Sequence, residues 1–261
     1  MPRRFLAGCR AIVTGASSGI GRELAIQLNA AGGELIVTAR RGERLAELRD
    51  LVADKGNKFV IVPGDITDPE LRRELINTAV RELGGLDLLL NNAGIGAFGP
   101  FAEADEERLL RIMEVNFFAP LELIRAALPH LQDGNRPLIC NIGSVLGHCA
   151  VPNKSEYCAS KFALHGFSDA LRAELRSQGI DVLLVSPSTT DSEFFSQVID
   201  KPGEDDVPVS PLKMPPAVVA RKTLSAIRRG RREVILSTTG NLLVWADRLL
   251  PGVVNWYLSR R

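Results

Sequence analysis

The alternation of short apolar runs with longer amphipathic segments constrains the fold of this chain most strongly. Seven runs rich in Val, Ile and Leu occur at residues 9–15, 32–39, 58–65, 86–94, 137–144, 180–188 and 232–238. They are nearly continuously apolar, as expected for strands with both faces covered by helices. The segments between them carry helical spacing, as in Leu164, Phe167, Leu171 and Leu175. The pattern predicts an α/β fold with a doubly wound parallel sheet of seven strands and helices on both faces.

Two regions depart from this alternation. Residues 199–216 are rich in proline and acidic residues and follow the sixth strand, so we expect an excursion loop of the kind that often covers a ligand site. Residues 239–261 form an apolar tail that carries both tryptophans and is interrupted by Pro251. No linker is visible, and 261 residues suit one large α/β domain. We therefore predict a single domain over residues 1–261.

Charge and cysteine content exclude several functional classes. The chain has 32 Lys and Arg against 31 Asp and Glu, which leaves no broad field for binding nucleic acid. Its four cysteines lack C-x-x-C spacing, so the sequence predicts no metal site and favours reduced thiols in the cytoplasm. The amino terminus lacks the apolar core of a signal peptide, and no apolar run reaches the roughly 18 residues of a membrane span.

The first strand ends in the glycine-rich stretch TGASSGIGR, and a helical pattern follows at once. Glycines at such a turn let backbone N–H groups and a helix amino terminus approach a pyrophosphate, which side chains would block. A merely tight turn is the alternative, but the strand before and the helix after favour a phosphate site. The candidate phosphate-binding residues are Gly15, Ser17, Ser18, Gly19, Ile20 and Gly21.

Arg40 and Arg41 follow the second strand, where a dinucleotide fold brings a side chain to the adenosine ribose. An acidic residue there favours a free 2′-hydroxyl, whereas a guanidinium favours a 2′-phosphate, which it can bind in bidentate fashion. The pair therefore favours NADP(H), with NAD(H) still possible. In the alternative interpretation both arginines are solvated residues at the start of the next helix.

Three motifs in order make the chain similar to the short-chain dehydrogenase/reductase family. They are TGASSGIG at 14–21, NNAG at 91–94 and the Tyr157-x-x-x-Lys161 pair. Further marks occur between and after them: Gly64-Asp65, Asn116, Ser144 and Pro187-Ser188. Together they cover nearly the whole chain. The resemblance implies a Rossmann-type sheet with a nicotinamide cofactor held across the carboxyl ends of the strands.

The resemblance also implies roles for individual positions. Asp65 and Ile66 would flank adenine, and Asn92, Ala93 and Gly94 would pass beneath the adenosine ribose. The nicotinamide end would be held by Tyr157, Lys161, Pro187, Ser188, Thr190 and Ser192. Two positions depart from the family pattern: Ser188 replaces a glycine, and Ser192 replaces a frequent threonine. If the backbone at position 188 adopts a conformation that favours glycine, we expect the Cβ of Ser188 to cause strain.

The predicted catalytic residues are Asn116, Ser144, Tyr157 and Lys161. Tyr157 and Lys161 are four residues apart on an expected helix over 156–176 and therefore share one face. A nearby ammonium lowers the high pKa of a tyrosine, so the phenol can act as general acid or base. Ser144 would orient the substrate oxygen, and the resemblance implies that Asn116 holds a water that connects Lys161 to solvent. Out of this context, Tyr and Lys at helical spacing are most often an ordinary amphipathic pair.

The substrate is less well defined by the sequence. The expected pocket wall includes Ile95, Phe98, Val145, Leu146, Phe194 and Phe195. This lining favours an apolar or lipid-like carbonyl compound or secondary alcohol. Two alternatives remain open: a reductase of 3-oxoacyl thioesters, and a dinucleotide-binding sensor without turnover. A hydrolase with Ser144 as nucleophile is disfavoured because the G-x-S-x-G elbow is missing. For His148 a surface or packing role is favoured over substrate contact.

Partners follow from the resemblance and from the tail. The family implies a homodimer or homotetramer built partly on the helix of Tyr157, whose opposite face carries Phe162. The tail 239–261 could pack on its own domain or a partner subunit, which we favour. Alternatively it could lie in a membrane interface, with Trp245 and Trp256 as anchors.

Overall fold

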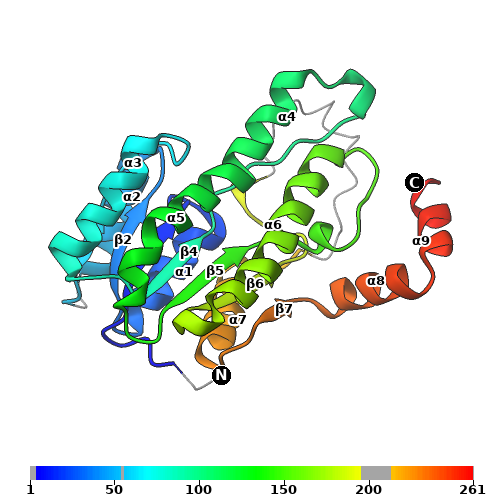
Figure 1. Cartoon of the computed structure of the whole chain (residues 1–261). Coiled ribbons are helices and arrows are strands. Elements are labelled where there is room, and N and C mark those ends of the chain that lie inside the picture. The colour runs from blue at the N-terminus through cyan, green and yellow to red at the C-terminus, as the bar shows by residue number, and fades with distance from the viewer. Residues whose placement is uncertain (1–3, 54–55, 195–212, 261) are drawn as a thin grey trace.

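The computed structural model describes residues 4–53, 56–194 and 213–260. Seven strands form one parallel sheet in the order β3-β2-β1-β4-β5-β6-β7. Each lies within one of the seven apolar runs of the sequence, and Figure 1 shows them as a twisted layer between helices. The strands are β1 Arg10–Thr14, β2 Glu34–Thr38, β3 Phe59–Ile61, β4 Leu88–Asn91, β5 Leu138–Ile142, β6 Asp181–Ser186 and β7 Glu233–Ile235. The prediction of a doubly wound parallel sheet is confirmed.

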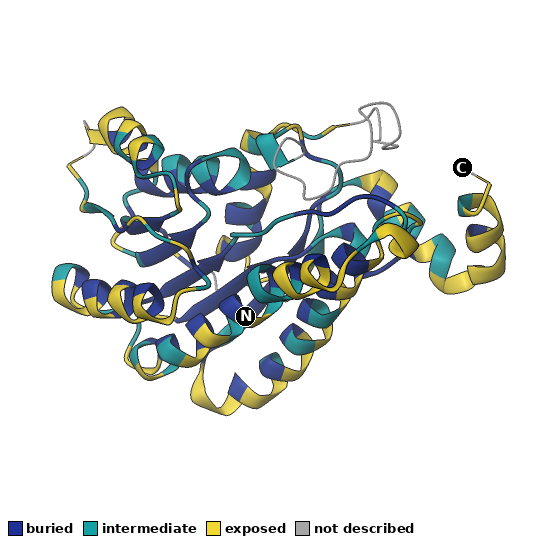
Figure 2. Ribbon diagram, turned by 90° about the horizontal axis from the view of Figure 1, so that it is seen from above, coloured by how far each residue is buried: buried dark blue, intermediate teal, exposed yellow. Residues whose placement is uncertain are grey.

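Helices cover both faces of the sheet, and their apolar sides form two cores. On one face α1 (Gly19–Ala30), α2 (Gly42–Val52) and α7 (Pro216–Arg228) bury residues such as Leu24, Leu45 and Val219. On the other face α3 (Pro69–Thr78), α5 (Ala119–Gln132) and α6 (Ser155–Glu174) bury residues such as Leu75 and Leu171. Figure 2 shows this division: buried strands lie in the centre, and each helix turns its exposed side outward.

The strand order places a crevice at the carboxyl ends of β1 and β4. From β1 the chain builds β2 and β3 on one side, then crosses back to place β4 against the other side of β1. The loops that leave β1 and β4 therefore diverge, and open α/β sheets bind ligands at such a switch point. The glycine turn follows β1, and the NNAG motif begins in the last residue of β4.

The segment between the fourth and fifth apolar runs is helical, as expected for the segments between runs, but a π-turn interrupts the helix. Helix α4 (Glu106–Met113) runs into the π-helical segment η4 (Glu114–Phe118), which leads into α5. The extra residue in a π-turn shifts the faces of the following helix, and such turns frequently occur at functional sites. Apolar spacing alone did not predict it, because the sequence remains helical through the segment.

The carboxyl-terminal tail forms two helices that extend from the body of the molecule. They are α8 (Thr238–Leu249) and α9 (Pro251–Leu258), and Pro251 begins the second helix, as the predicted interruption requires. Figures 1 and 2 both show this arm reaching away from the sheet. Val244 and Val254 are buried, but the outer faces expose Leu242, Trp245, Leu249, Leu250, Val253, Trp256 and Tyr257. Among the described helices, none is both long and apolar enough to cross a bilayer.

Candidate active site

A cavity of about 1010 Å³ opens at the carboxyl ends of the strands. Most of the residues predicted to bind cofactor or to act on substrate line it. They are Gly15, Ser17, Ser18, Gly19, Ile20, Arg40, Arg41, Asp65, Ile66, Asn92, Ala93, Gly94, Ser144, Tyr157, Lys161, Pro187, Ser188, Thr190 and Ser192. Two predicted residues, Gly21 and Asn116, do not face the cavity and lie behind its wall.

The glycine turn is shaped by close backbone approach. Gly15 has φ +68°, and a Cβ on Gly21 would lie 2.2 Å from the carbonyl oxygen of Gly15. Both positions therefore require glycine. The turn leads directly into the amino terminus of α1, whose first N–H groups have no partner within the helix. The turn fits the pyrophosphate of a dinucleotide, which needs a cradle free of side chains.

Thr14, the last residue of β1, holds this turn to the NNAG motif. Thr14 Oγ1 accepts hydrogen bonds from the backbone N–H groups of Asn92 (2.9 Å) and Ala93 (3.0 Å). In return, Asn92 Nδ2 donates to the Thr14 carbonyl at 2.9 Å. These bonds lock the loops after β1 and β4 together at the switch point. Thr14 is the first residue of the TGASSGIG motif, but its role in joining the two loops depends on their packing.

Arg41 points toward the glycine turn and contacts both of its serines. Its guanidinium donates to Ser17 Oγ at 3.1 Å and Ser18 Oγ at 3.0 Å, and forms an ion pair with Glu193 at 2.9 Å. Arg44 pairs with the same carboxylate at 3.0 Å. Hydrogen bonding to Arg41 lowers the pKa of Glu193. Two guanidinium groups thus meet at one anion, beside the hydroxyls of the glycine turn, and guanidinium groups are donors suited to a phosphate.

Tyr157 lies in the first turn of α6 and is hydrogen-bonded to Ser144. Ser144 caps the short 3₁₀ segment η5 (Val145–Gly147), and its hydroxyl accepts a hydrogen bond from the N–H of Leu146 at 3.0 Å. Burial raises the pKa of Tyr157 to about 12. In the protein alone the phenol is therefore protonated at neutral pH and able to donate its proton.

Lys161 lies one helical turn beyond Tyr157 and is almost fully buried. Its Nζ donates to the carbonyl oxygen of Ile142 at 3.1 Å and lies 5.8 Å from the centroid of the Tyr157 ring. Desolvation lowers the pKa of Lys161 to about 8. A lysine with this pKa can exchange a proton near neutral pH and still supply positive charge to the phenol.

Asn116 is held in the π-turn by a two-way contact with the backbone of Ile95. Its Oδ1 accepts from the Ile95 N–H, and its Nδ2 donates to the Ile95 carbonyl, each at 2.9 Å. Nδ2 also donates to Ser160 Oγ at 3.0 Å. The asparagine thus links the loop after β4 to α6 in the described structure. Its expected water-holding role stays a prediction.

A buried ion pair beside Tyr157 was not predicted from the sequence. Arg108 of α4 contacts Glu156 of α6 with two donors, Nη2 at 2.6 Å and Nε at 3.0 Å, and both side chains are at most 3% exposed. The pair fixes the first turn of α6 against α4. Neither residue stands out in sequence, because surface helices commonly carry Arg and Glu.

The wall of the cavity contains most of the expected apolar residues and also segments that were not expected. Ile95, Phe98, Val145, Leu146 and Phe194 line it, whereas Phe195 and residues 199–212 lie outside the described residues. The ring of Phe194 packs edge-on against the ring of Tyr157, with the two ring centroids 5.8 Å apart. Further wall residues come from α4, η4 and the tail: Leu110, Arg111, Glu114, Phe118, Thr239, Gly240, Leu243 and Leu258.

Two sequence expectations near the site are also resolved. Strain was expected at Ser188 if its backbone conformation were one that favours glycine. Its φ is not positive, since the non-glycine residues with positive φ in the described chain are Arg136 and Asn153. Ser188 therefore adopts a conformation open to any residue.

His148 does not line the cavity, and its side chain is fully buried, which favours the packing role over substrate contact.

The family model for short chain dehydrogenases matches residues 10–203, about three quarters of the chain. The chain belongs to this family. Family membership makes it an oxidoreductase with a dinucleotide-binding fold. The matched range contains the glycine turn, the NNAG motif and Tyr157 with Lys161.

Curated relatives of this short chain dehydrogenase extend over nearly all of its length. "Dehydrogenase/reductase SDR family member 7B" of Bos taurus is 30% identical over 96% of this chain and 80% of its own. "Dehydrogenase/reductase SDR family protein 7-like" of Anopheles gambiae is 31% identical over 99% of this chain and 84% of its own.

Solved structures agree with the fold. A short-chain dehydrogenase from Streptomyces avermitilis superposes with a TM-score of 0.81 at 29% identity, covering 96% of both chains. One from Burkholderia cenocepacia in complex with NADP has a TM-score of 0.77 at 28% identity, covering 89% of this chain and 96% of its own. One from Burkholderia phymatum in complex with NAD has a TM-score of 0.87 at 22% identity, covering 96% of both chains, and shows the fold alone.

Proposed function

We propose that this short chain dehydrogenase is an NADP(H)-dependent oxidoreductase that interconverts a carbonyl and a secondary alcohol on an apolar or lipid-like small molecule. The arrangement of Ser144, Tyr157 and Lys161 carries the proposal. The phenol of Tyr157 is hydrogen-bonded to Ser144, with Lys161 one turn away, at the wall of a cavity that also contains the glycine turn. When bound, the nicotinamide dinucleotide supplies or accepts a hydride.

The residues of the chain position the substrate and move one proton. In the reductive direction the Ser144 hydroxyl orients the carbonyl oxygen, and Tyr157 donates its proton to the developing alkoxide. In the oxidative direction Tyr157 accepts the alcohol proton, which requires its high pKa to fall. The positive charge of Lys161 favours the phenolate, and the lysine, with a pKa of about 8, can pass the proton onward. Asn116 would hold the water that completes this route.

The preference for NADP(H) is supported by the surroundings of Arg41. The Arg41 guanidinium lines the cavity and is held there by hydrogen bonds to the hydroxyls of Ser17 and Ser18. Arg40 also lines the cavity nearby. A 2′-phosphate would take the place of the Glu193 carboxylate as the anion at Arg41. Related solved structures contain either NAD or NADP, so the preference rests on these residues of the chain.

The apolar substrate class is supported by the wall of the cavity. Ile95, Phe98, Val145, Leu146 and Phe194 supply aliphatic and aromatic surface around Tyr157, and Leu243 and Leu258 extend it into the tail. A bulky apolar ketone would bury its hydrocarbon here and place its polar oxygen at Ser144 and Tyr157.

Steady-state assays of the full chain test the proposal. NADPH or NADH is mixed with a panel of aliphatic, cyclic and steroid-like ketones and 3-oxoacyl thioesters, and the absorbance of the reduced nicotinamide is followed. We expect turnover of apolar ketones, faster with NADPH, and loss of turnover in Tyr157→Phe while NADPH still quenches tryptophan fluorescence. Turnover of thioesters alone would move the assignment to an acyl-thioester reductase. Dinucleotide binding without any turnover, in either direction, would make the protein a sensor.

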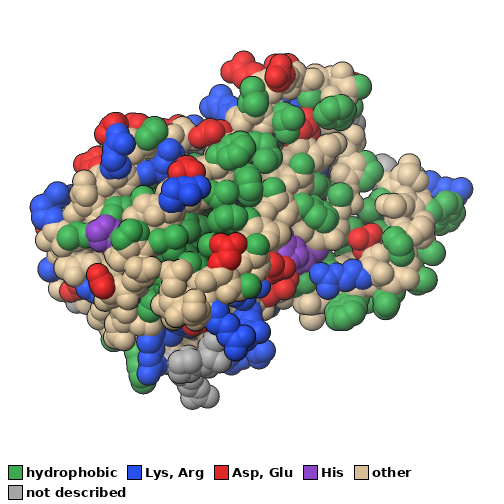
Figure 3. All heavy atoms as spheres, in the orientation of Figure 1, with side chains coloured by type: hydrophobic (Ala, Val, Ile, Leu, Met, Phe, Trp, Pro, Cys, Tyr) green, Lys and Arg blue, Asp and Glu red, His purple; other side chains and the backbone are tan. Residues whose placement is uncertain are grey.

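We also propose that the chain forms a homodimer or homotetramer, with α6 and the tail as contact elements. Phe162 of α6 is 43% exposed, and Leu242 and Leu249 of α8 are each 71% exposed. Figure 3 shows apolar side chains gathered on the protruding arm. Exposed apolar surface of this kind marks an interaction site. The four cysteines are free thiols, which supports placement of the assembly in the cytoplasm, with contact at a membrane surface as the competing role of the tail.

Substitution separates these two roles better than truncation, because the tail also contributes Leu243 and Leu258 to the cavity. The variant Leu242→Gln/Leu249→Gln is compared with Leu51→Gln, at a solvent-facing leucine of α2 (57% exposed). We expect light scattering to show a smaller assembly for the α8 variant alone. Unchanged mass together with lost flotation on anionic lipid vesicles would assign the tail to the membrane instead.

A further inference from the structure

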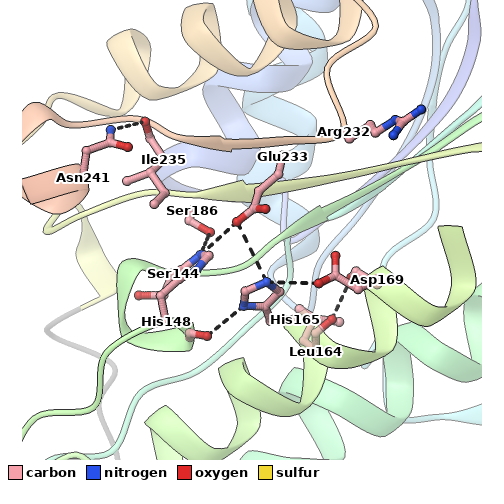
Figure 4. A network of polar contacts seen from close by, with 12 residues as sticks. Ser144, His148, Leu164, His165, Asp169, Ser186, Arg232, Glu233, Ile235 and Asn241 are labelled. Atoms are coloured by element: carbon pink, nitrogen blue, oxygen red, sulfur yellow. Dashed lines mark hydrogen bonds and ion pairs between the residues drawn. The ribbon is translucent and has the colours of Figure 1, made fainter. Parts of the chain in front are cut away.

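Two histidines and a glutamate converge on one point outside the cavity. His148 follows η5, His165 lies on α6, and Glu233 begins β7, so three elements distant in sequence contribute one side chain each. Glu233 Oε1 lies 3.6 Å from Nε2 of His148 and 3.9 Å from Nε2 of His165. One ligand atom from each of the three residues lies within 4.8 Å of the other two. Figure 4 shows the side chains pointing toward one another between β7 and α6.

From this geometry we propose that His148, His165 and Glu233 form a binding site for a divalent transition metal ion, with Zn²⁺ as the preferred ion. Two imidazole nitrogens and one carboxylate oxygen are a donor set that zinc uses, whereas Mg²⁺ and Ca²⁺ prefer oxygen alone. The proposal does not depend on the substrate or cofactor assigned above.

His165 is oriented as a metal ligand. Its Nδ1 lies 3.0 Å from the carbonyl oxygen of Gly147, which can only accept, so Nδ1 carries the proton and donates. In the neutral ring the lone pair of Nε2 then faces the cluster, where Asp169 Oδ2 lies at 3.4 Å and Glu233 Oε1 at 3.9 Å. A lone pair facing two carboxylates is stabilised by a cation between them. A ligating histidine that donates its other N–H to a backbone carbonyl is the usual arrangement at metal sites.

His148 is available as a neutral ligand. Its side chain is fully buried, which disfavours the charged imidazolium. Nε2 lies 2.8 Å from Ser186 Oγ, and the hydroxyl can be the donor, which leaves the lone pair on Nε2. A metal ion would take this lone pair in place of the serine proton. Nδ1 has no hydrogen-bond partner among the described residues, so it can carry the ring proton without breaking a contact.

Two of the three ligand-atom separations are close to those that tetrahedral zinc requires. Bonds of about 2.0–2.2 Å place neighbouring ligand atoms roughly 3.4 Å apart. The separations of 3.6 Å and 3.9 Å need a small inward shift, and Glu233 can make it because its side chain is 37% exposed. The third separation, between the two histidine ligand atoms, is at most 4.8 Å. In the described chain Glu233 pairs with the two histidines and with no Lys or Arg. Asp169, which also pairs with Arg172, or a water molecule would complete the coordination.

The position of the site gives it a structural role in the active centre. His148 lies four residues after Ser144, and His165 lies four residues after Lys161. A bound ion would tie the Ser144 loop to the helix that carries Tyr157 and Lys161, and both to β7. None of the three ligands lines the cavity, so the ion would hold this geometry and would not contact the substrate.

Direct metal binding tests the site. Full-length, tag-free protein is treated with chelator, dialysed and titrated with Zn²⁺ in competition with a chromophoric chelator. A parallel Co²⁺ titration reports coordination through its visible absorption. We expect one Zn²⁺ per chain, intense Co²⁺ bands of tetrahedral type, a higher melting temperature with Zn²⁺, and no comparable response to Mg²⁺.

Variants then assign the ligands. Glu233→Gln and His165→Gln change partly exposed side chains and should still fold, unlike substitution of the buried His148; far-ultraviolet circular dichroism verifies this. Each should weaken Zn²⁺ binding at least tenfold and remove the rise in melting temperature. His130→Gln, at the one histidine of the chain that is not a proposed ligand, should bind as wild type does. Absence of stoichiometric Zn²⁺ binding, or equal binding by all three variants, would overturn the proposal. NMR spectra of the histidine side chains would also overturn the proposal if they showed two things: His165 is an imidazolium held by the two carboxylates, and its resonances do not change when Zn²⁺ is added.

Discussion

Replacing Glu156 with glutamine should cost this protein a large part of its stability. The carboxylate contacts Arg108 through two hydrogen bonds of 2.6 Å and 3.0 Å, and the two side chains are 3% and 2% exposed. The substitution removes the negative charge but leaves the guanidinium buried without a counter-charge. Breaking a buried pair in this way costs about 3–5 kcal/mol.

Urea denaturation followed by circular dichroism measures the loss, and the chain provides a matched control. Glu122 pairs with Arg125 at 3.2 Å on the surface of α5, where the side chains are 48% and 75% exposed. The free energy of unfolding of Glu122→Gln should fall by less than about 1 kcal/mol, because water screens this pair. The double variant Arg108→Met/Glu156→Leu should recover much of the loss, since two apolar side chains of similar volume need no solvation.

The three unfolding curves decide the reasoning. If Glu156→Gln lowers the free energy of unfolding no more than Glu122→Gln does, burial does not control the energy of this pair. If the double variant is less stable than Glu156→Gln, the pair contributes more than it costs to bury. Because Glu156 directly precedes Tyr157 in the first turn of α6, we also expect Glu156→Gln to reduce kcat more than it changes the affinity for NADPH.

Three further predictions concern the cofactor turn and the buried lysine. Arg41→Ala should weaken NADPH binding by roughly 10–100-fold, because a charge-assisted hydrogen bond is worth about 1.5–3 kcal/mol, and should leave NADH binding unchanged. Fluorescence titration measures both affinities, and an equal loss for the two cofactors would contradict the 2′-phosphate role. Gly21→Ala should abolish dinucleotide binding because its Cβ would lie 2.2 Å from a carbonyl oxygen, whereas Gly166→Ala, with nothing within 4 Å of its Cβ, should bind normally and melt slightly higher. Lys161 has a folded-state pKa of about 8, below its unfolded value of about 10.4, so the unfolded chain binds more protons in between and stability should rise with pH. From pH 8 to pH 10 the free energy of unfolding of wild type should gain about 2 kcal/mol relative to Lys161→Met. Urea titrations at each pH measure this. If the difference between the two proteins stayed the same across this pH range, the lysine would not be desolvated.

Much of the fold could be predicted from the sequence because its signals are local. A strand covered on both faces is continuously apolar, a helix repeats its apolar residues every three to four positions, and each of the seven runs became a strand of the sheet. The glycine turn, Ser144, Tyr157 and Lys161 follow from the same locality. They lie at or just after strand ends or in one helical turn, and parallel strands bring their carboxyl ends to one edge.

Only the tertiary structure decided which distant side chains meet. Arg108 pairs with Glu156 across 48 positions, and His148, His165 and Glu233 converge from a loop, a helix and a strand. None of these residues has a local pattern, because Arg, Glu and His are also common on solvent-facing surfaces. The same holds for the π-turn at Asn116 and for the tail residues that line the cavity. Periodicity in the sequence determined which face of each element is buried, whereas the packing of one element on another determined which polar groups share a site.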